Sequence, residues 1–204
     1  MGSELDFAYQ FVPGSSGRTL LMLHGTGGDE HDLLPLGREL DPTANLLSPR
    51  GKVLENGSLR FFRRLAEGVF DLEDLQRRTR ELAEFIRRAT EHYQLAPEQI
   101  VAVGYSNGAN IAANILLRQP GTLPSAVLLR AMAPSQPETL PDLTGVRVWI
   151  AGGRDDALIP SEETQRLADL LEKVGADVTL HLVNADHGLT NTELVLAKRW
   201  LATL

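Results

Sequence analysis

The stretch Ile100-Val101-Ala102-Val103-Gly104-Tyr105-Ser106-Asn107-Gly108 is the most informative part of this 204-residue chain. Four apolar residues predict a buried strand, and the alanine- and asparagine-rich run over 106–118 predicts a helix packed closely on a sheet. Ser106 then lies in a tight strand-to-helix turn, where side chains at positions 104 and 108 would collide. No Lys-Ser or Lys-Thr pair follows the glycines, as a phosphate-binding loop would require. The stretch therefore predicts an exposed serine nucleophile.

Short apolar runs alternate with longer helical patterns along the rest of the chain, which is typical of a parallel α/β architecture. Strands are expected over residues 7–12, 19–23, 44–47, 100–103, 126–129, 146–151 and 178–183. The first mixes polar and apolar residues and is expected at an edge. Further helices are expected after Asp71, over 161–174 with Ser161 as the cap, and over 192–204. The predicted fold class is one α/β domain over 1–204, with a mostly parallel sheet and helices on both faces.

Composition excludes several classes of function. The chain has no cysteine, which rules out thiol nucleophiles, disulfides and cysteine-based zinc sites. A net charge of −7 argues against nucleic-acid binding, because phosphates must be neutralised by a basic surface. No apolar run approaches the length of a membrane span, and no basic residue precedes Arg18, so neither a membrane partner nor a secretory signal is expected. We expect a cytoplasmic protein that acts on a small molecule.

A serine hydroxyl needs a neighbouring base, and five histidines are available. In the chain order that goes with this kind of turn, the acid and then the base follow the serine, which excludes His92. His181 lies within a predicted strand, whereas His187 lies in the loop between the last strand and the last helix. His187 is therefore the predicted base. The acid should follow the strand over 146–151, where Asp155 and Asp156 are adjacent, and position alone does not choose between them.

The loop Leu23-His24-Gly25-Thr26-Gly27-Gly28-Asp29 follows another predicted strand, and its small residues leave backbone N–H groups free to face a substrate oxygen. Together with the N–H of Asn107, the residue after the nucleophile, the N–H of Thr26 is the expected oxyanion donor. His24 is expected to brace this loop rather than to catalyse. Asp29 is expected to cap the next helix.

These motifs together resemble the phospholipase/carboxylesterase family of α/β-hydrolases, which includes acyl-protein thioesterases. The matching segments are HGTGGDE (24–30), GYSNGA (104–109), DALIP (156–160) and DHG (186–188). In that family the acid lies four residues before the proline, which implies Asp156, and the first oxyanion donor follows His-Gly, which implies Thr26. One departure is Asn107, where the thioesterases usually have glutamine, and this weakens a claim to acylated proteins as substrates.

The segment 50–70 is irregular and resembles still more closely a bacterial branch of carboxylesterases, often linked to quinone- or catechol-response operons. In that branch the segment forms a wall over the site. The resemblance implies that Phe61 and Phe62 contact the acyl or aryl group of the substrate, with core packing as the alternative. The segment's arginines either bind an anionic substrate group or pair with acidic neighbours, which are Glu67, Asp71, Glu73 and Asp74.

The function expected from these features is that of a serine carboxylesterase. Ser106 would attack short-chain acyl or aryl esters to form an acyl-enzyme, His187 would relay the proton, and Asp156 would orient His187. No cofactor or metal is implied, no separate lid domain is expected, and the family often forms homodimers. Two alternatives remain, namely an acyl thioesterase or lysophospholipase, and a non-catalytic ligand-binding protein on the same fold.

Overall fold

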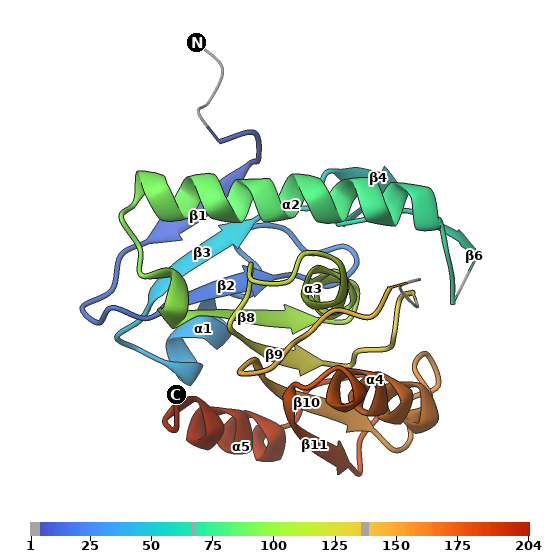
Figure 1. Cartoon of the computed structure of the whole chain (residues 1–204). Coiled ribbons are helices and arrows are strands. Elements are labelled where there is room, and N and C mark those ends of the chain that lie inside the picture. Colours follow the sequence, from blue (N-terminus) through green and yellow to red (C-terminus); the bar gives the residue numbers. More distant parts are fainter. Residues whose placement is uncertain (1–4, 67, 136–138) are drawn as a thin grey trace.

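A seven-stranded sheet runs through the centre of the computed structural model, which describes residues 5–66, 68–135 and 139–204 (Figure 1). The strand order is β1-β3-β2-β8-β9-β10-β11, and all neighbouring pairs are parallel except β1 with β3. The strands are β1 (Tyr9–Val12), β2 (Thr19–Leu23), β3 (Asn45–Pro49), β8 (Ile100–Tyr105), β9 (Ser125–Leu129), β10 (Arg147–Gly153) and β11 (Asp177–Val183). The mixed strand predicted at 7–12 is thus the antiparallel edge strand.

Helices cover both faces of this sheet, as predicted (Figure 1). On one face lie α2 (Leu72–His92), α3 (Asn107–Arg118) and α4 (Ser161–Lys173); on the other lie α1 (Leu34–Leu40) and α5 (Asn191–Leu201). A short 3₁₀ helix, η1 (Pro97–Gln99), precedes β8. In β2, Leu21 belongs to the first buried cluster, and Leu20 and Met22 belong to the second. Each cluster fills one side of the sheet because successive side chains of a strand point to opposite faces. The predicted fold class is confirmed.

The predicted helix caps have different outcomes. Asp71 caps α2, its carboxylate accepting a hydrogen bond from the Asp74 N–H at 3.1 Å. The cap predicted at Asp29 is wrong, because α1 begins only at Leu34 and Asp29 instead accepts from the His31 N–H in a local turn. The cap predicted at Ser161 is also wrong, because Pro160 precedes a helix that already includes position 161.

The segment 50–70 is not irregular but forms two hairpins. The first pairs β4 (Val53–Glu55) with β5 (Ser58–Arg60), and the second pairs β6 (Arg64–Ala66) with β7 (Val69–Phe70). Asn56 and Gly57 connect β4 and β5 with φ angles of 51° and 81°. An Asn-Gly pair in this left-handed conformation is the preferred two-residue hairpin turn, and it is the signal that the sequence interpretation overlooked.

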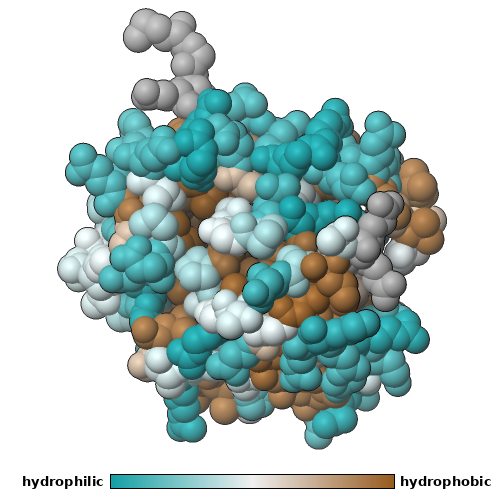
Figure 2. Space-filling model, in the orientation of Figure 1, coloured by the Kyte–Doolittle hydropathy of each residue, from teal (hydrophilic) through white to brown (hydrophobic). Residues whose placement is uncertain are grey.

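The second hairpin projects beside the N-terminal end of α2 (Figure 1). Leu65 and Val69 are exposed there, and Figure 2 shows apolar surface at this edge, whereas the surface over α2 is mostly hydrophilic. Within the described ranges, no helix has both the length and the apolar character to cross a membrane.

Candidate active site

Ser106 is the single residue between the end of β8 and the start of α3. Its φ and ψ angles are 51° and −113°, a conformation that L-amino acids rarely adopt. The surrounding backbone holds it there, since its N–H donates to the Leu129 carbonyl at 2.8 Å and its carbonyl accepts from the Asn110 N–H at 2.9 Å. The turn therefore holds Ser106 in a strained backbone conformation.

Both flanking glycines are required by close backbone contacts. A Cβ at Gly108 would lie 2.0 Å from the carbonyl oxygen of Leu23, and a Cβ at Gly104 would lie 2.6 Å from Cα of Ala109. Backbone atoms cannot move aside as a flexible side chain can. The collision inferred from the Gly-x-Ser-x-Gly pattern thus corresponds to specific atoms.

The side chains of Ser106, His187 and Asp156 are connected in series. Nε2 of His187 lies 3.0 Å from Oγ of Ser106, and Nδ1 of His187 lies 2.8 Å from Oδ2 of Asp156. The carboxylate accepts at Nδ1, so Nδ1 carries the proton and Nε2 is free to accept the hydroxyl proton. The structure brings together three residues that are 31 and 50 positions apart in the sequence.

Asp156 is the buried member of the adjacent acidic pair, whereas Asp155 is exposed. The second oxygen of Asp156, Oδ1, accepts hydrogen bonds from the N–H groups of Leu158 and Ile159 at 2.9 and 3.0 Å. Both carboxylate oxygens are therefore engaged, which fixes the plane of the group against the imidazole. Of the adjacent pair, Asp156 is the residue that contacts His187, and it is also the one that the family resemblance implied as the acid.

Three consecutive carbonyls of the loop carrying His187 accept hydrogen bonds from side chains at or just beyond the ends of two central strands. The hydroxyl of Tyr105 donates to the His187 carbonyl at 2.9 Å. Arg130, which directly follows β9, donates from Nε to the Asp186 carbonyl at 3.0 Å and from Nη2 to the Gly188 carbonyl. Burial raises the pKa of Tyr105, which keeps its hydroxyl protonated as a donor. The sequence interpretation missed both residues, although a charged residue at the end of an apolar strand was a visible signal.

A pocket of about 310 Å³ opens over Ser106. Thr26 and Asn107 line it together with Ser106 and His187, so the two expected oxyanion donors lie beside the serine. Asn107 is the first residue of α3, and an N–H in the first turn of a helix has no acceptor within that helix. The remaining lining residues are Arg60, Arg64, Gly68, Phe70, Tyr105, Asn110, Met132, Leu158 and Ile159.

His24 braces the loop that carries Thr26, as expected. Its Nδ1 donates to the Gly25 carbonyl at 2.7 Å, and its Nε2 accepts from the Gly51 N–H at 2.9 Å. The ring thereby joins this loop to the start of segment 50–70. Burial lowers the pKa of His24, which favours the neutral ring that this pair of hydrogen bonds requires.

Phe61 and Phe62, which the resemblance implied as substrate contacts, lie in the core. Their side chains are 2% and 0% exposed and belong to the core cluster that includes Leu75 and Leu82, and neither side chain lines the pocket. The alternative, core packing, is correct. Phe70 lines the pocket instead, and its ring packs edge-on to that of Phe62 with the ring centroids 5.1 Å apart.

The side chain of Asn107 has a contact that the sequence did not indicate. Its Oδ1 accepts a hydrogen bond from the Phe61 N–H at 2.7 Å, so the residue after the serine also holds segment 50–70 in place. Its Nδ2 is buried and has no hydrogen-bond partner among the residues that the structure describes.

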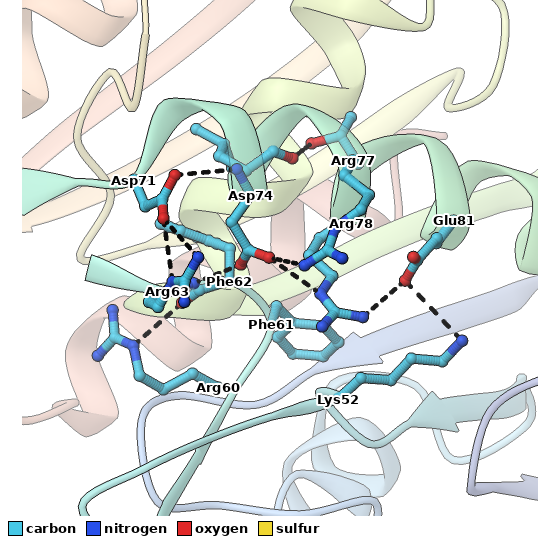
Figure 3. Close-up of polar contacts among 12 residues, drawn as sticks. Lys52, Arg60, Phe61, Phe62, Arg63, Asp71, Asp74, Arg77, Arg78 and Glu81 are labelled. Carbon is cyan, nitrogen blue, oxygen red and sulfur yellow. Dashed lines mark hydrogen bonds and ion pairs between the residues drawn. The ribbon is translucent and has the colours of Figure 1, made fainter. Parts of the chain in front are cut away.

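Acidic residues at the N-terminal end of α2 also contact segment 50–70 (Figure 3). Asp74 accepts from the Arg63 N–H at 2.8 Å and is paired with Arg77 and Arg78. Burial raises the pKa of Asp74, but these contacts outweigh burial and lower it overall. Asp71, one of the acidic partners expected for the segment's arginines, pairs with Arg63, whose Nη2 lies 2.8 Å from Oδ2.

Other predicted pairings differ. Arg64 pairs with Glu55 rather than with a residue of α2, its Nε lying 2.7 Å from Oε1. Glu67, another predicted partner, lies outside the described residues. Among the residues that the structure describes, no group of three or more His, Cys, Asp or Glu side chains is placed to hold a metal ion.

Comparisons with known proteins assign the chain to a family. Residues 14–204 match the model of the family described as Phospholipase/Carboxylesterase. The chain belongs to the phospholipase/carboxylesterase family. Membership confirms the resemblance carried by the four sequence motifs and places the chain among ester-hydrolysing enzymes.

Individual relatives span nearly the whole chain. It is 49% identical over 190 residues to "Putative hydrolase MhqD" of Bacillus subtilis (strain 168), covering 93% of this chain and 95% of MhqD. Among solved structures, the Bacillus cereus carboxylesterase superposes with a TM-score of 0.94 at 48% identity, covering 97% of this chain and 94% of that one. The carboxylesterase from Mesorhizobium loti gives a TM-score of 0.91 at 30% identity, covering 97% and 95%.

Proposed function

We propose that this protein is a serine carboxylesterase that hydrolyses short-chain acyl or aryl esters through an acyl-enzyme. The observation that carries the proposal is the 3.0 Å contact between Oγ of Ser106 and Nε2 of His187, on a ring whose Nδ1 is held by Asp156 at 2.8 Å. A strained serine in hydrogen-bond contact with an oriented imidazole is the arrangement that activates a hydroxyl for attack on a carbonyl.

In the first half-reaction, Oγ of Ser106 attacks the ester carbonyl carbon while its proton passes to Nε2 of His187. The carbonyl oxygen becomes an oxyanion, which accepts hydrogen bonds from the N–H groups of Thr26 and Asn107. The tetrahedral intermediate collapses, the C–O bond to the alcohol breaks, and the leaving oxygen takes the proton from His187. Asp156 stabilises the imidazolium that exists between these two transfers.

In the second half-reaction, water attacks the acyl-enzyme and gives its proton to His187. The second tetrahedral intermediate then releases the carboxylic acid, and Ser106 recovers its proton. The pocket of about 310 Å³ lies at the lower end of the range for small-molecule sites, which favours short acyl groups over long lipid chains.

The test is hydrolysis of 4-nitrophenyl acetate and butyrate by the wild type, by Ser106→Ala and by Ser161→Ala. Ser161 is a matched control, because it does not line the pocket and its hydroxyl donates to the side chain of Glu162 at the start of α4. We expect kcat of Ser106→Ala to fall by about 10³-fold or more and that of Ser161→Ala to stay near the wild-type value. Equal activity of the wild type and Ser106→Ala would refute the mechanism. Faster turnover of acyl thioesters than of matched esters would point to a thioesterase.

A further inference from the structure

The lining of the pocket has a charge opposite in sign to that of the whole chain. The chain carries a net charge of −7, yet the described lining includes Arg60 and Arg64 and no aspartate or glutamate. Surface electrostatics as a whole would repel an anionic substrate. The two guanidinium groups make the electrostatic potential positive at the pocket itself, over the short distance at which charges act at physiological salt.

Arg60 is a buried cation without a full set of acceptors. Its side chain is 4% exposed, its Nε donates to the Phe62 carbonyl at 3.2 Å, and its Nη1 donates to Oγ1 of Thr26 at 2.5 Å. In the described part of the chain, no hydrogen bond uses Nη2. Figure 3 shows the guanidinium of Arg60 directed away from the carboxylates of Asp74 and Glu81.

The carboxylate of Glu55 lies near both arginines, but its hydrogen bonds are with Arg64. Oε1 of Glu55 accepts from Nε of Arg64 at 2.7 Å, and Oε2 accepts from the Arg64 N–H at 3.2 Å. The same Oε2 lies 3.8 Å from Nε of Arg60, beyond hydrogen-bond distance. Burial, with the neighbouring charge of Arg64, lowers the pKa of Arg60, so its charged form is under-stabilised in the free protein. Arg60 and Arg64 together thus carry one positive charge more than Glu55 neutralises.

We propose that Arg60, with Arg64, forms a subsite for a carboxylate carried by the substrate, so that the preferred substrates are small anionic esters. This inference rests on the proposed function and specifies its substrate class. A planar guanidinium with a free edge matches a carboxylate in geometry as well as in charge. Arg60 contacts the side chain of Thr26, the expected oxyanion donor, so the subsite lies directly beside the reacting carbonyl.

The test uses two pairs of esters that differ in one charge. On the alcohol side, 4-acetoxybenzoate is compared with 4-acetoxybenzamide; on the acyl side, mono(4-nitrophenyl) adipate is compared with 4-nitrophenyl hexanoate. Each kcat/KM is divided by the hydroxide-catalysed rate of the same ester, which removes differences in intrinsic reactivity. We expect the wild type to favour the anionic member of at least one pair by about tenfold or more.

Two variants locate this preference. Arg60→Gln should lose most of it, whereas Arg63→Gln should keep it, because Arg63 belongs to the same segment but is exposed, pairs with Asp71 and does not line the pocket. If Arg60→Gln does not fold, Arg64→Glu decides, since Arg64 is partly exposed and its charge reversal should favour the neutral ester. An unchanged ratio in Arg60→Gln and in Arg64→Glu, or an equal loss for both members of a pair, would leave Arg60 a purely structural role and overturn the proposal.

Binding measurements separate this proposal from the proposed function. Calorimetric titration of Ser106→Ala with 4-acetoxybenzoate and with 4-acetoxybenzamide reports on the subsite without turnover. Tighter binding of the anion, lost in Ser106→Ala/Arg60→Gln, supports the subsite even if the wild type hydrolyses no ester. Hydrolysis of neutral esters with no anionic preference in rate or binding would leave the esterase mechanism intact and refute the subsite.

Discussion

Arg130 and Glu193 form an ion pair in which neither side chain is exposed to solvent. Nη2 of Arg130 lies 3.0 Å from Oε1 of Glu193, and Nη1 lies 3.1 Å from Oε2. The same guanidinium holds the carbonyls of Asp186 and Gly188, one on each side of His187. Glu193 also accepts from the Thr190 N–H at 3.0 Å at the start of α5. The pair therefore connects β9 and α5 to the loop that carries the proposed base.

Arg130→Met should lower the free energy of unfolding by about 3–5 kcal/mol, because it leaves the carboxylate of Glu193 buried and unpaired. Adding Glu193→Gln removes that charge and keeps an acceptor for the Thr190 N–H, so urea denaturation should show partial recovery. Esterase activity should stay about 10- to 100-fold low in the double variant, because the loop of His187 still lacks its two donors. Recovery of activity together with stability would show that Arg130 does not position His187.

Ser106→Gly should be more stable than Ser106→Ala by about 1–2 kcal/mol. Both variants lack the hydroxyl, but only glycine adopts φ of 51° and ψ of −113° without strain. The relief of about 1–3 kcal/mol exceeds the extra entropy, about 0.5–1 kcal/mol, that glycine loses on folding. Urea denaturation of the two variants measures the difference directly. Equal stabilities would mean that the turn is not strained.

Asn107→Ala should destabilise the protein by about 1–3 kcal/mol, because it leaves the buried N–H of Phe61 without an acceptor. Esterase activity should fall as well, since this hydrogen bond holds the segment that carries Arg60, Arg64 and Phe70 over the pocket. Thermal unfolding and kcat/KM for 4-nitrophenyl butyrate check the two parts. A loss of stability with unchanged kcat/KM would show that catalysis does not depend on how this hydrogen bond holds segment 50–70.

The stability of the protein should depend on pH through His24. Burial lowers the pKa of His24 below its ordinary value of 6.5, against the hydrogen bond to the Gly25 carbonyl and the carboxylates of Asp32, Asp29 and Glu30, which raise it. As the pH falls below about 6.5, the unfolded chain takes up a proton at this residue before the folded protein does. The contribution of neutral His24 is therefore complete above that pH and is lost as the pH falls toward the folded-state pKa.

His24→Gln should give a flatter dependence of the unfolding free energy on pH than the wild type, measured by urea denaturation between about pH 8 and pH 5. His31→Gln is the matched control, because His31 is an exposed residue of the same loop. The same slope in the wild type and in His24→Gln would show that the buried ring does not contribute.

The sequence determined the features that depend on neighbouring residues or on chain order. Gly104 and Gly108 identify the turn at Ser106 because the contacts that forbid side chains there are made by the turn itself and by the adjacent strand. The prediction of His187 as the base follows from its place in the loop after the last strand. The alternation of apolar runs and helical patterns determined the α/β class, since strands covered on both faces must be apolar throughout.

Tertiary structure decided what depends on residues far apart in the chain. Asp155 and Asp156 have the same chemistry, and only the approach of His187, 31 positions from Asp156, distinguishes them. Phe61 and Phe62 face the core and Phe70 faces the pocket because two hairpins set the direction of each side chain. Composition likewise cannot show that Arg60 lines the pocket or that Arg130 contacts the loop that carries His187. Their partners, Thr26 and Glu193, are 34 and 63 positions away, and only the folded sheet brings them into contact.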